Sequence, residues 1–226
     1  MKQTRQSDHL SSSLTDLMTS LMVIFILLLV SRLNNQAGWR AAAAAELERR
    51  LQSQMKETGQ QAAVGRAKDD PNTLIIDIPN TLITFDPQEA KLRPGGHEFL
   101  NEHIPAWAKI VRAEDIRPSI DNIVVEGHSD QTRWQNSSFE ESKERNLALS
   151  QHRSMAVVSD SLSILRENPK HRDCFLEKLS ATGRGEEDPA DPKHPASLKN
   201  RRVVFKIRLR PELVGHVAES LRKTVR

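Results

Sequence analysis

The sequence has very little cysteine and few aromatic residues. Its 226 residues include one cysteine and no tyrosine, and aromatic residues make up only 4%. A single cysteine excludes a scaffold built on internal disulfides and a zinc site made of cysteines. The scarcity of aromatic rings argues against a stacking platform for single-stranded nucleic acid. The charges nearly cancel, with 33 Lys and Arg against 30 Asp and Glu, which is not typical of a nucleic-acid-binding protein.

Apolar residues are concentrated in one stretch near the N-terminus, residues 14–33 (LTDLMTSLMVIFILLLVSRL). Residues 21–30 are all apolar, and Asp16 and Arg32 carry the only charges in the stretch. A membrane-spanning helix needs about 20 residues, because each residue adds about 1.5 Å to its length. The stretch therefore predicts a single membrane span.

A cleaved signal peptide is the alternative interpretation of this stretch. The small residues Ala41–Ala45 would then supply the cleavage site, but they lie about ten residues beyond the apolar run, too far for the usual geometry. The basic residues do not set the orientation of a span. Lys2 and Arg5 precede it, whereas Arg32, Arg40, Arg49 and Arg50 follow it.

Residues 37–58 are rich in Ala, Glu, Arg and Gln and contain no proline, which predicts a helix. Leu47, Leu51 and Met55 recur at every fourth position. This thin apolar stripe fits either pairing with a second copy of the chain or a solvated extension of the membrane helix. Glycines and Asp69–Pro71 then indicate a linker.

From residue 72 onward, the pattern predicts alternating strands and helices. Strands are expected at 73–78, 120–126, 178–182 and 202–209, and helices at 98–111 and 142–167. The order βαβαββ predicts an α+β fold with helices on one side of a mixed sheet. The expected organisation is an N-terminal tail (1–13), a membrane helix (14–33), a helical extension and linker (34–71), the α+β domain (72–210) and a C-terminal helix (211–226).

Asp16 is a candidate functional residue because it lies inside the expected span. An ionised carboxylate in a membrane costs several kcal/mol, so it normally faces a partner or a water-filled path. Thr19 and Ser20 follow at helical spacing and share its face, which makes one polar stripe compatible with H⁺ or Na⁺. The alternative is that Asp16 lies among the lipid headgroups and caps the helix.

Three short motifs lie in order in the C-terminal part: EGHSD at Glu126–Asp130, NLALSQHR at Asn146–Arg153, and NRRVVF at Asn200–Phe205. Together they resemble the OmpA-like peptidoglycan-binding family. The stretch Ile83–Gly96 and the GxG at Gly183–Gly185 match it as well. The resemblance covers residues 72–210 and implies the α+β fold of that family.

The resemblance also implies a site for the diaminopimelate of the peptidoglycan stem peptide. Asp130 would bind its ammonium group and Arg153 its carboxylate, because a guanidinium pairs with a carboxylate through two parallel hydrogen bonds. Asn146 and Leu149 would orient the ligand and form a wall. Of two consecutive strand residues only one can face the site, so either Arg201 or Arg202 would contribute.

The sequence departs from the family at residues 131–145, which form a longer connection containing Trp134 and Phe139. These aromatic residues are placed to cover the pocket or to contact a partner. His128 and His152 are potential metal ligands together with Asp130, but no metal or other cofactor is expected. No enzyme is expected either, because no nucleophile, base and orienting residue occur together.

An apolar span that begins with an aspartate, followed by a wall-binding domain, resembles the MotB family of stator subunits in ion-driven rotary motors. The resemblance implies a dimer in the bacterial inner membrane, with a cytoplasmic N-terminus, a periplasmic C-terminal domain and a ring of MotA-like partners. Asp16 would carry the ion, supported by Thr19 and Ser20. The short linker and the composition of the span are more similar to the ZorB subunits of the Zorya anti-phage systems, whose partner is ZorA.

Three alternatives from other classes stay open. The first is a flagellar-type stator that drives motility. The second is a passive anchor between membrane and peptidoglycan, and the third is a secreted wall-binding protein whose apolar segment is removed.

Overall fold

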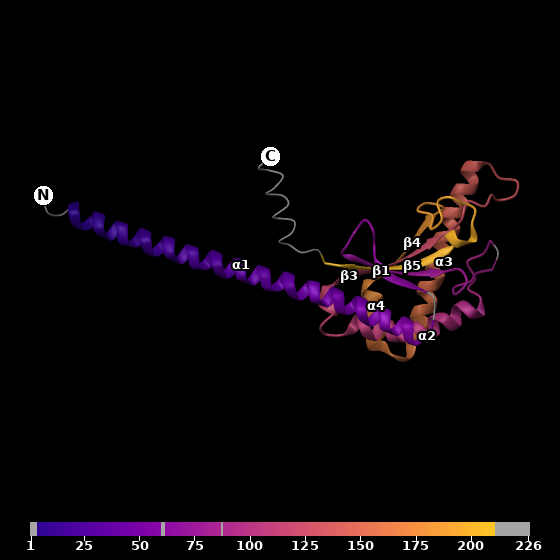
Figure 1. The fold of residues 1–226 in the computed structure, drawn as a ribbon, viewed down its shortest axis with the longest axis horizontal. Helices are drawn as coiled ribbons and strands as arrows, with labels where there is room; N and C mark the ends of the chain where they lie inside the picture. Colours follow the sequence, from indigo (N-terminus) through magenta and orange to yellow (C-terminus); the bar gives the residue numbers. More distant parts are fainter. Residues whose placement is uncertain (1–3, 60–61, 87, 211–226) are drawn as a thin grey trace. The chain divides into compact units, whose positions relative to one another are not determined.

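The computed structural model describes residues 4–59, 62–86 and 88–210, and it describes no side chains for 4–14 and 32–41. The chain divides into two compact units, residues 1–42 with 211–226, and residues 43–210. Helix α1 (Thr4–Glu57) contributes to both units, and all the other elements belong to the second (Figure 1). The expected C-terminal helix lies outside the described residues. Most of the expected N-terminal tail belongs to α1.

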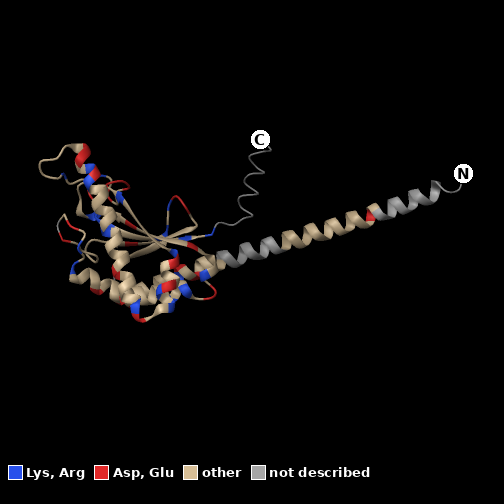
Figure 2. Ribbon diagram, turned by 180° about the vertical axis from the view of Figure 1, so that it is seen from behind, with Lys and Arg blue, Asp and Glu red and all other residues tan. Residues whose placement is uncertain are grey.

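The described side chains in the first half of α1 are exposed and mainly apolar. Large apolar side chains between Leu17 and Val30 are 43–70% exposed. After Asp16 this part of the helix carries no charge, as its uniform tan colour in Figure 2 shows. Within the part of the chain that the structure describes, no helix has both the length and the hydropathy that a membrane span needs.

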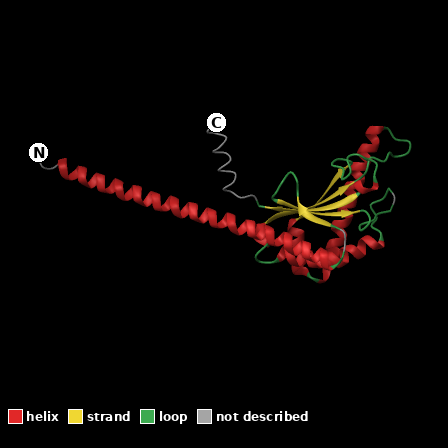
Figure 3. Cartoon of the chain, viewed as in Figure 1, coloured by secondary structure: helices red, strands yellow, loops and turns green. Residues whose placement is uncertain are grey.

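The second unit is built on one five-stranded mixed sheet with the strand order β1-β2-β5-β3-β4 (Figure 3). Strands β3 and β4 are parallel and all other neighbours are antiparallel, which confirms the expected mixed sheet. The expected βαβαββ order lacks one strand and one helix. The strands are β1 (Ala63–Arg66), β2 (Thr73–Pro79), β3 (Ile120–His128), β4 (Leu179–Gly185) and β5 (Arg202–Leu209).

Helices cover one face of this sheet, and the core lies between them and alternate strand residues. The side chains on that face include Ile76, Val125 and Phe205, each at most 1% exposed. The helices are α2 (Pro94–Arg112), α3 (Phe139–Ile164), α4 (Pro169–Lys178) and the end of α1, with 3₁₀ turns at Arg117–Ser119, Leu165–Glu167 and Leu198–Asn200.

Helix α4 is the element that the expected βαβαββ order lacks between α3 and β4. Asn168 and Pro169 end the long helix, as expected, but they also start a new one. The side chain of Asn168 accepts a hydrogen bond from the His171 backbone N–H, and Pro169 occupies the first turn. Proline fits there because its missing N–H would have no partner within the helix.

The end of α1 belongs to the domain, which therefore begins at Ala43 rather than at residue 72. Leu47 and Leu51 are completely buried and Met55 is 4% exposed. Gln54, which directly precedes Met55, accepts a hydrogen bond from Trp107 Nε1 and donates one to His103 Nδ1, both at 2.8 Å.

This packing corrects two expectations. The apolar stripe of α1 lies in the chain's own core, so these three side chains are not free to pair with a second copy. Residues 63–66 were expected in a linker, but they form β1, which pairs with β2 at the edge of the sheet.

The substitution Leu51→Ala tests whether α1 is part of the domain core. Replacing this fully buried side chain in a fragment of residues 43–210 (Leu51→Ala) leaves a cavity and is expected to lower the free energy of unfolding by about 2–5 kcal/mol. Urea unfolding followed by circular dichroism measures the change.

The matched control is Leu176→Ala in helix α4, because that side chain is 46% exposed. Its effect is expected to stay within about 0.5 kcal/mol. Equal effects of the two substitutions would contradict the assignment of α1 to the core.

Candidate ligand-binding site

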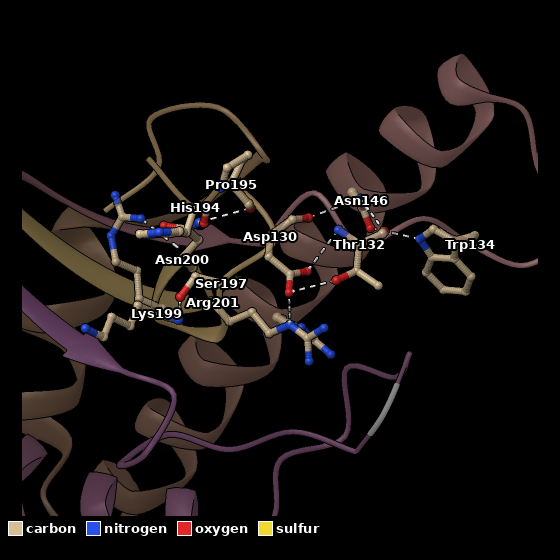
Figure 4. A network of polar contacts seen from close by, with 12 residues as sticks. Asp130, Thr132, Trp134, Asn146, His194, Pro195, Ser197, Lys199, Asn200 and Arg201 are labelled. Atoms are coloured by element: carbon tan, nitrogen blue, oxygen red, sulfur yellow. Dashed lines mark hydrogen bonds and ion pairs between the residues drawn. The ribbon is translucent and has the colours of Figure 1, made fainter. Parts of the chain in front are cut away.

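The site begins with a buried carboxylate just beyond the end of β3. Asp130 is 4% exposed, and its Oδ2 accepts hydrogen bonds from Arg201 Nε at 2.9 Å and from Thr132 Oγ1 at 3.0 Å (Figure 4). Arg201 directly precedes β5, so the neighbouring strands β3 and β5 bring the two charges together. A buried carboxylate needs such partners because leaving water is costly for an unpaired charge.

Asn146 of helix α3 holds the loop that carries Asp130. Its side-chain nitrogen donates to the backbone carbonyls of Asp130 and Thr132, at 3.3 and 3.4 Å. Its Oδ1 accepts a hydrogen bond from Trp134 Nε1 at 2.8 Å (Figure 4). Asn146 is 5% exposed, so it orients the loop rather than presenting a free amide to the cavity.

The position of α3 is fixed by its close approach to the sheet. A Cβ atom on Gly127 would lie 2.2 Å from the carbonyl oxygen of Ser150, and one on Gly183 would lie 2.5 Å from the backbone nitrogen of Gln151. Only glycine fits at such distances. The side chain of Gln151 also accepts a hydrogen bond from the Gly183 N–H at 2.6 Å, which ties the helix to β4.

Arg153 lies further along α3 and is half-buried. Its Nε donates to the carbonyl of Glu89 at 3.0 Å, and its guanidinium lies 5.1 Å from the centre of the Phe85 ring. Burial lowers the pKa of Arg153 to about 10; the positive charge of Arg201 acts in the same direction and Asp130 opposes it. It therefore stays charged at neutral pH, yet it has no ion-pair partner among the described residues.

These side chains surround a cavity of about 220 Å³. Five of the six residues expected from the sequence line it, namely Asp130, Asn146, Leu149, Arg153 and Arg201. With Arg133, one carboxylate and three arginines thus line one cavity, an arrangement complementary to a group that carries both an ammonium and a carboxylate. The lining also includes Gln88, Ser129, Thr132, Arg133 and Trp134.

Arg202 is the expected residue that does not line this cavity. Its Nη2 donates to the carbonyl of Asp188 at 2.8 Å, and its Nε lies 3.5 Å from Asp77. The expectation that only one of two consecutive arginines faces the cavity fits this geometry, and that residue is Arg201.

Thr132 and Gln88 line the cavity but were missed in the sequence. A threonine two residues after an aspartate is a signal for a local turn, and here its hydroxyl bonds to the Asp130 carboxylate. Gln88 has no comparable signal, because it is brought in by the loop between β2 and α2.

The two aromatic residues of the 131–145 connection behave differently. Trp134 lines the cavity, held by Asn146 and by Ser142, whose hydroxyl accepts its backbone N–H at 3.0 Å. Phe139 is 49% exposed, and the guanidinium of Arg133 lies 4.4 Å from its ring centre. Trp134 alone therefore forms part of the wall.

The histidine and glutamate of the EGHSD segment interact with other residues of the sheet. Burial raises the pKa of Glu126, but the neighbouring His128 and Lys206 side chains outweigh this effect and lower that pKa to about 2. Lys206 Nζ lies 2.6 Å from the carboxylate. In the described parts of the chain, no three histidine, cysteine or acidic side chains are grouped as a metal site would require.

Asp16, Thr19 and Ser20 lie on α1 and are exposed. The hydroxyl of Thr19 donates to the carbonyl of Thr15 at 2.7 Å, a hydrogen bond to the preceding turn of the helix.

Comparison with known proteins identifies the fold. No protein-family model matches the sequence, and no curated protein matches it. A MotB-like protein from Desulfovibrio vulgaris matches with 22% identity and a TM-score of 0.52, covering 78% of this chain and 96% of that one. The periplasmic domain of Helicobacter pylori MotB matches with 17% identity and a TM-score of 0.50, covering 73% and 92%. The three proteins share one fold. This confirms the expected α+β architecture.

The close approach of α3 to the sheet gives a testable prediction. A methyl group at Gly127 (Gly127→Ala) would collide with the backbone of Ser150, so the free energy of unfolding is expected to fall by about 1–3 kcal/mol. Because α3 carries Arg153 and Asn146, the chemical shifts of the Trp134 indole should move as well.

Gly95→Ala serves as the control, because a Cβ there has no atom within 4 Å. Gly95 lies in α2, where alanine favours the helix by up to about 1 kcal/mol, so stability should be unchanged or raised. If Gly127→Ala leaves the free energy of unfolding unchanged, α3 has room to move and the prediction is wrong.

Proposed function

We propose that residues 43–210 anchor the chain to peptidoglycan, by binding the diaminopimelate of the stem peptide. The observation that carries this proposal is the cavity in which buried Asp130 meets Arg153 and Arg201. The ligand's ammonium group would approach Asp130. Its carboxylate would bind the guanidiniums, which present paired N–H donors. The fold shared with MotB periplasmic domains is compatible with this role.

We further propose that residues 14–33 hold the chain in the bacterial inner membrane, with the N-terminus in the cytoplasm and the wall-binding domain in the periplasm. The length and the apolar character of this stretch in the sequence support the assignment. In this arrangement the chain joins the membrane to the wall, as a stator must.

Asp16 would then carry ions, with Thr19 and Ser20 beside it. A dimer of these chains would stand inside a ring of MotA-like partners, and ion flow would turn the ring against the anchored dimer. The resemblance of the span to ZorB makes anti-phage defence with ZorA the preferred role. A flagellar-type stator for motility is the second candidate, and a passive anchor is the third.

The wall-binding step is tested by Arg153→Ala. Losing a charged hydrogen bond of about 1.5–3 kcal/mol should weaken binding to purified peptidoglycan sacculi roughly tenfold to a hundredfold. Cosedimentation over a range of sacculus concentrations measures the affinity. Arg153→Lys keeps the charge but loses the planar fork, so an intermediate affinity is expected.

The matched control is Arg166→Ala, because that exposed arginine lies in the 3₁₀ turn that follows α3. Its binding and its thermal unfolding should equal those of the unmodified chain. If Arg153→Ala sediments with sacculi like the control, the diaminopimelate assignment is wrong.

The motor function is tested by Asp16→Asn in cells that carry the native operon. The amide keeps the size of the side chain but cannot take up or release a proton, so protection against phage plating should be lost at an unchanged membrane level. Asp16→Glu keeps the carboxyl group and should retain part of the protection.

Each other result selects one of the remaining candidates. Protection that persists in Asp16→Asn would indicate a passive anchor. A loss of swimming instead of protection would indicate a flagellar-type stator.

A further inference from the structure

A second cavity, of about 240 Å³, adjoins the first and shares Arg153 and Arg201 with it. Its lining contains two more arginines, Arg93 and Arg202, together with His128. None of the described residues that line it is acidic. The charged residues of the second lining are therefore all arginines, whereas the first cavity combines arginines with the Asp130 carboxylate.

Arg93 and Arg201 each use only one of their donor groups to bind an acidic partner. Arg93 Nε donates to Asp86 at 2.9 Å, and Arg201 Nε donates to Asp130 at 2.9 Å. Both pairs use Nε alone, so the terminal Nη groups of these two side chains have no hydrogen-bond partner within 4–59, 62–86 and 88–210. Each planar guanidinium thus has two further NH₂ groups with which to bind a ligand.

Two buried side chains in the same lining each have one nitrogen without a hydrogen-bond partner among the described residues. His128 is 3% exposed, and its Nε2 makes no hydrogen bond in the described structure; the nearest carboxylate oxygen, on Glu126, is 3.7 Å away. Arg202 is 8% exposed, and its Nε has only the ion pair at 3.5 Å to Asp77. Buried polar groups are normally hydrogen-bonded, and Arg202 Nε is a donor that lacks an acceptor at hydrogen-bond distance among the described residues.

We infer that the second cavity binds a second carboxylate of the same stem peptide, and that the protein selects stem peptides in which this carboxylate is free. The inference rests on the proposed wall binding. Because the two cavities meet at Arg153 and Arg201, one ligand can occupy both, and the anionic groups of a stem peptide are carboxylates. The carboxylate adjacent in the peptide to diaminopimelate is the α-carboxylate of D-glutamate.

Amidation of that carboxylate would oppose binding for a simple chemical reason. A guanidinium has five N–H donors and no acceptor. An amide replaces one acceptor oxygen with an NH₂ group, which would face these donors without a hydrogen bond. It also removes the negative charge that pairs with the arginines.

The test compares two synthetic tripeptides by isothermal titration with the full chain in detergent. One is L-Ala-γ-D-Glu-meso-diaminopimelate, and the other carries an amide on the D-glutamate α-carboxyl. The unmodified chain is expected to bind the free acid about tenfold more tightly, the scale of one charged hydrogen bond. Arg93→Gln should reduce this ratio to about one while the chain still binds the amidated peptide, since Arg93 does not line the first cavity.

Arg117→Gln is the matched control. Arg93 and Arg117 have equal side-chain exposure, 49%, and each pairs with one acidic residue, Asp86 or Glu177. The control should keep the full preference for the free acid. A second variant, Asn80→Asp, adds a negative charge to the lining without changing its size, and it should weaken binding of the free acid more than binding of the amide.

The outcomes separate this inference from the proposed function. If the unmodified chain binds both tripeptides equally, or if Arg93→Gln keeps the preference, the second subsite is refuted and wall binding stands. If the chain binds neither tripeptide, both are overturned.

Discussion

The arrangement of the site depends on the contact between helix α3 and two strands of the sheet. At Gly127 and Gly183 the helix backbone lies so close that any side chain would overlap with it. This contact sets the height of α3 above β3 and β4, and α3 carries Asn146, Leu149 and Arg153. Asn146 in turn holds the loop that contains Asp130 and Trp134. A shift of the helix would therefore displace both the cationic and the anionic side of the cavity.

The hydrogen bonds of Gln151 reinforce this contact in the direction along the strand. Its side chain bonds to the N–H of Gly183 and to the carbonyl of Ala181, two backbone groups of the edge strand β4. Strand β4 has no further strand on its outer side in the sheet order. These hydrogen bonds give two backbone groups of β4 a partner, and they also hold α3 in position. The same bonds therefore make the site more rigid.

The sequence predicted the parts of the fold that have clear local patterns. Strand β5 alternates apolar and polar residues, and β2 and β3 are rich in branched residues, so their places were predicted closely. Strand β1 contains Ala63, Val64, Gly65 and Arg66, which form no recognisable strand pattern, and it exists only because β2 offers it an edge. Likewise, the stripe at Leu47, Leu51 and Met55 predicted a helix, but which surface buries it depends on tertiary packing.

The same distinction applies to the site. The four residues that the motifs singled out, Asp130, Asn146, Leu149 and Arg153, line one cavity, because each lies at a fixed position relative to a strand end or a helix turn. The pairing of Asp130 with Arg201 depends on the register between β3 and β5, which a sequence does not display. Arg201 pairs with the buried Asp130 through Nε alone, so its Nη groups have no partner among the described residues. In the proposed binding, this ion pair would hold the carboxylate in place before a ligand arrives, so binding would not have to bear the cost of ordering it.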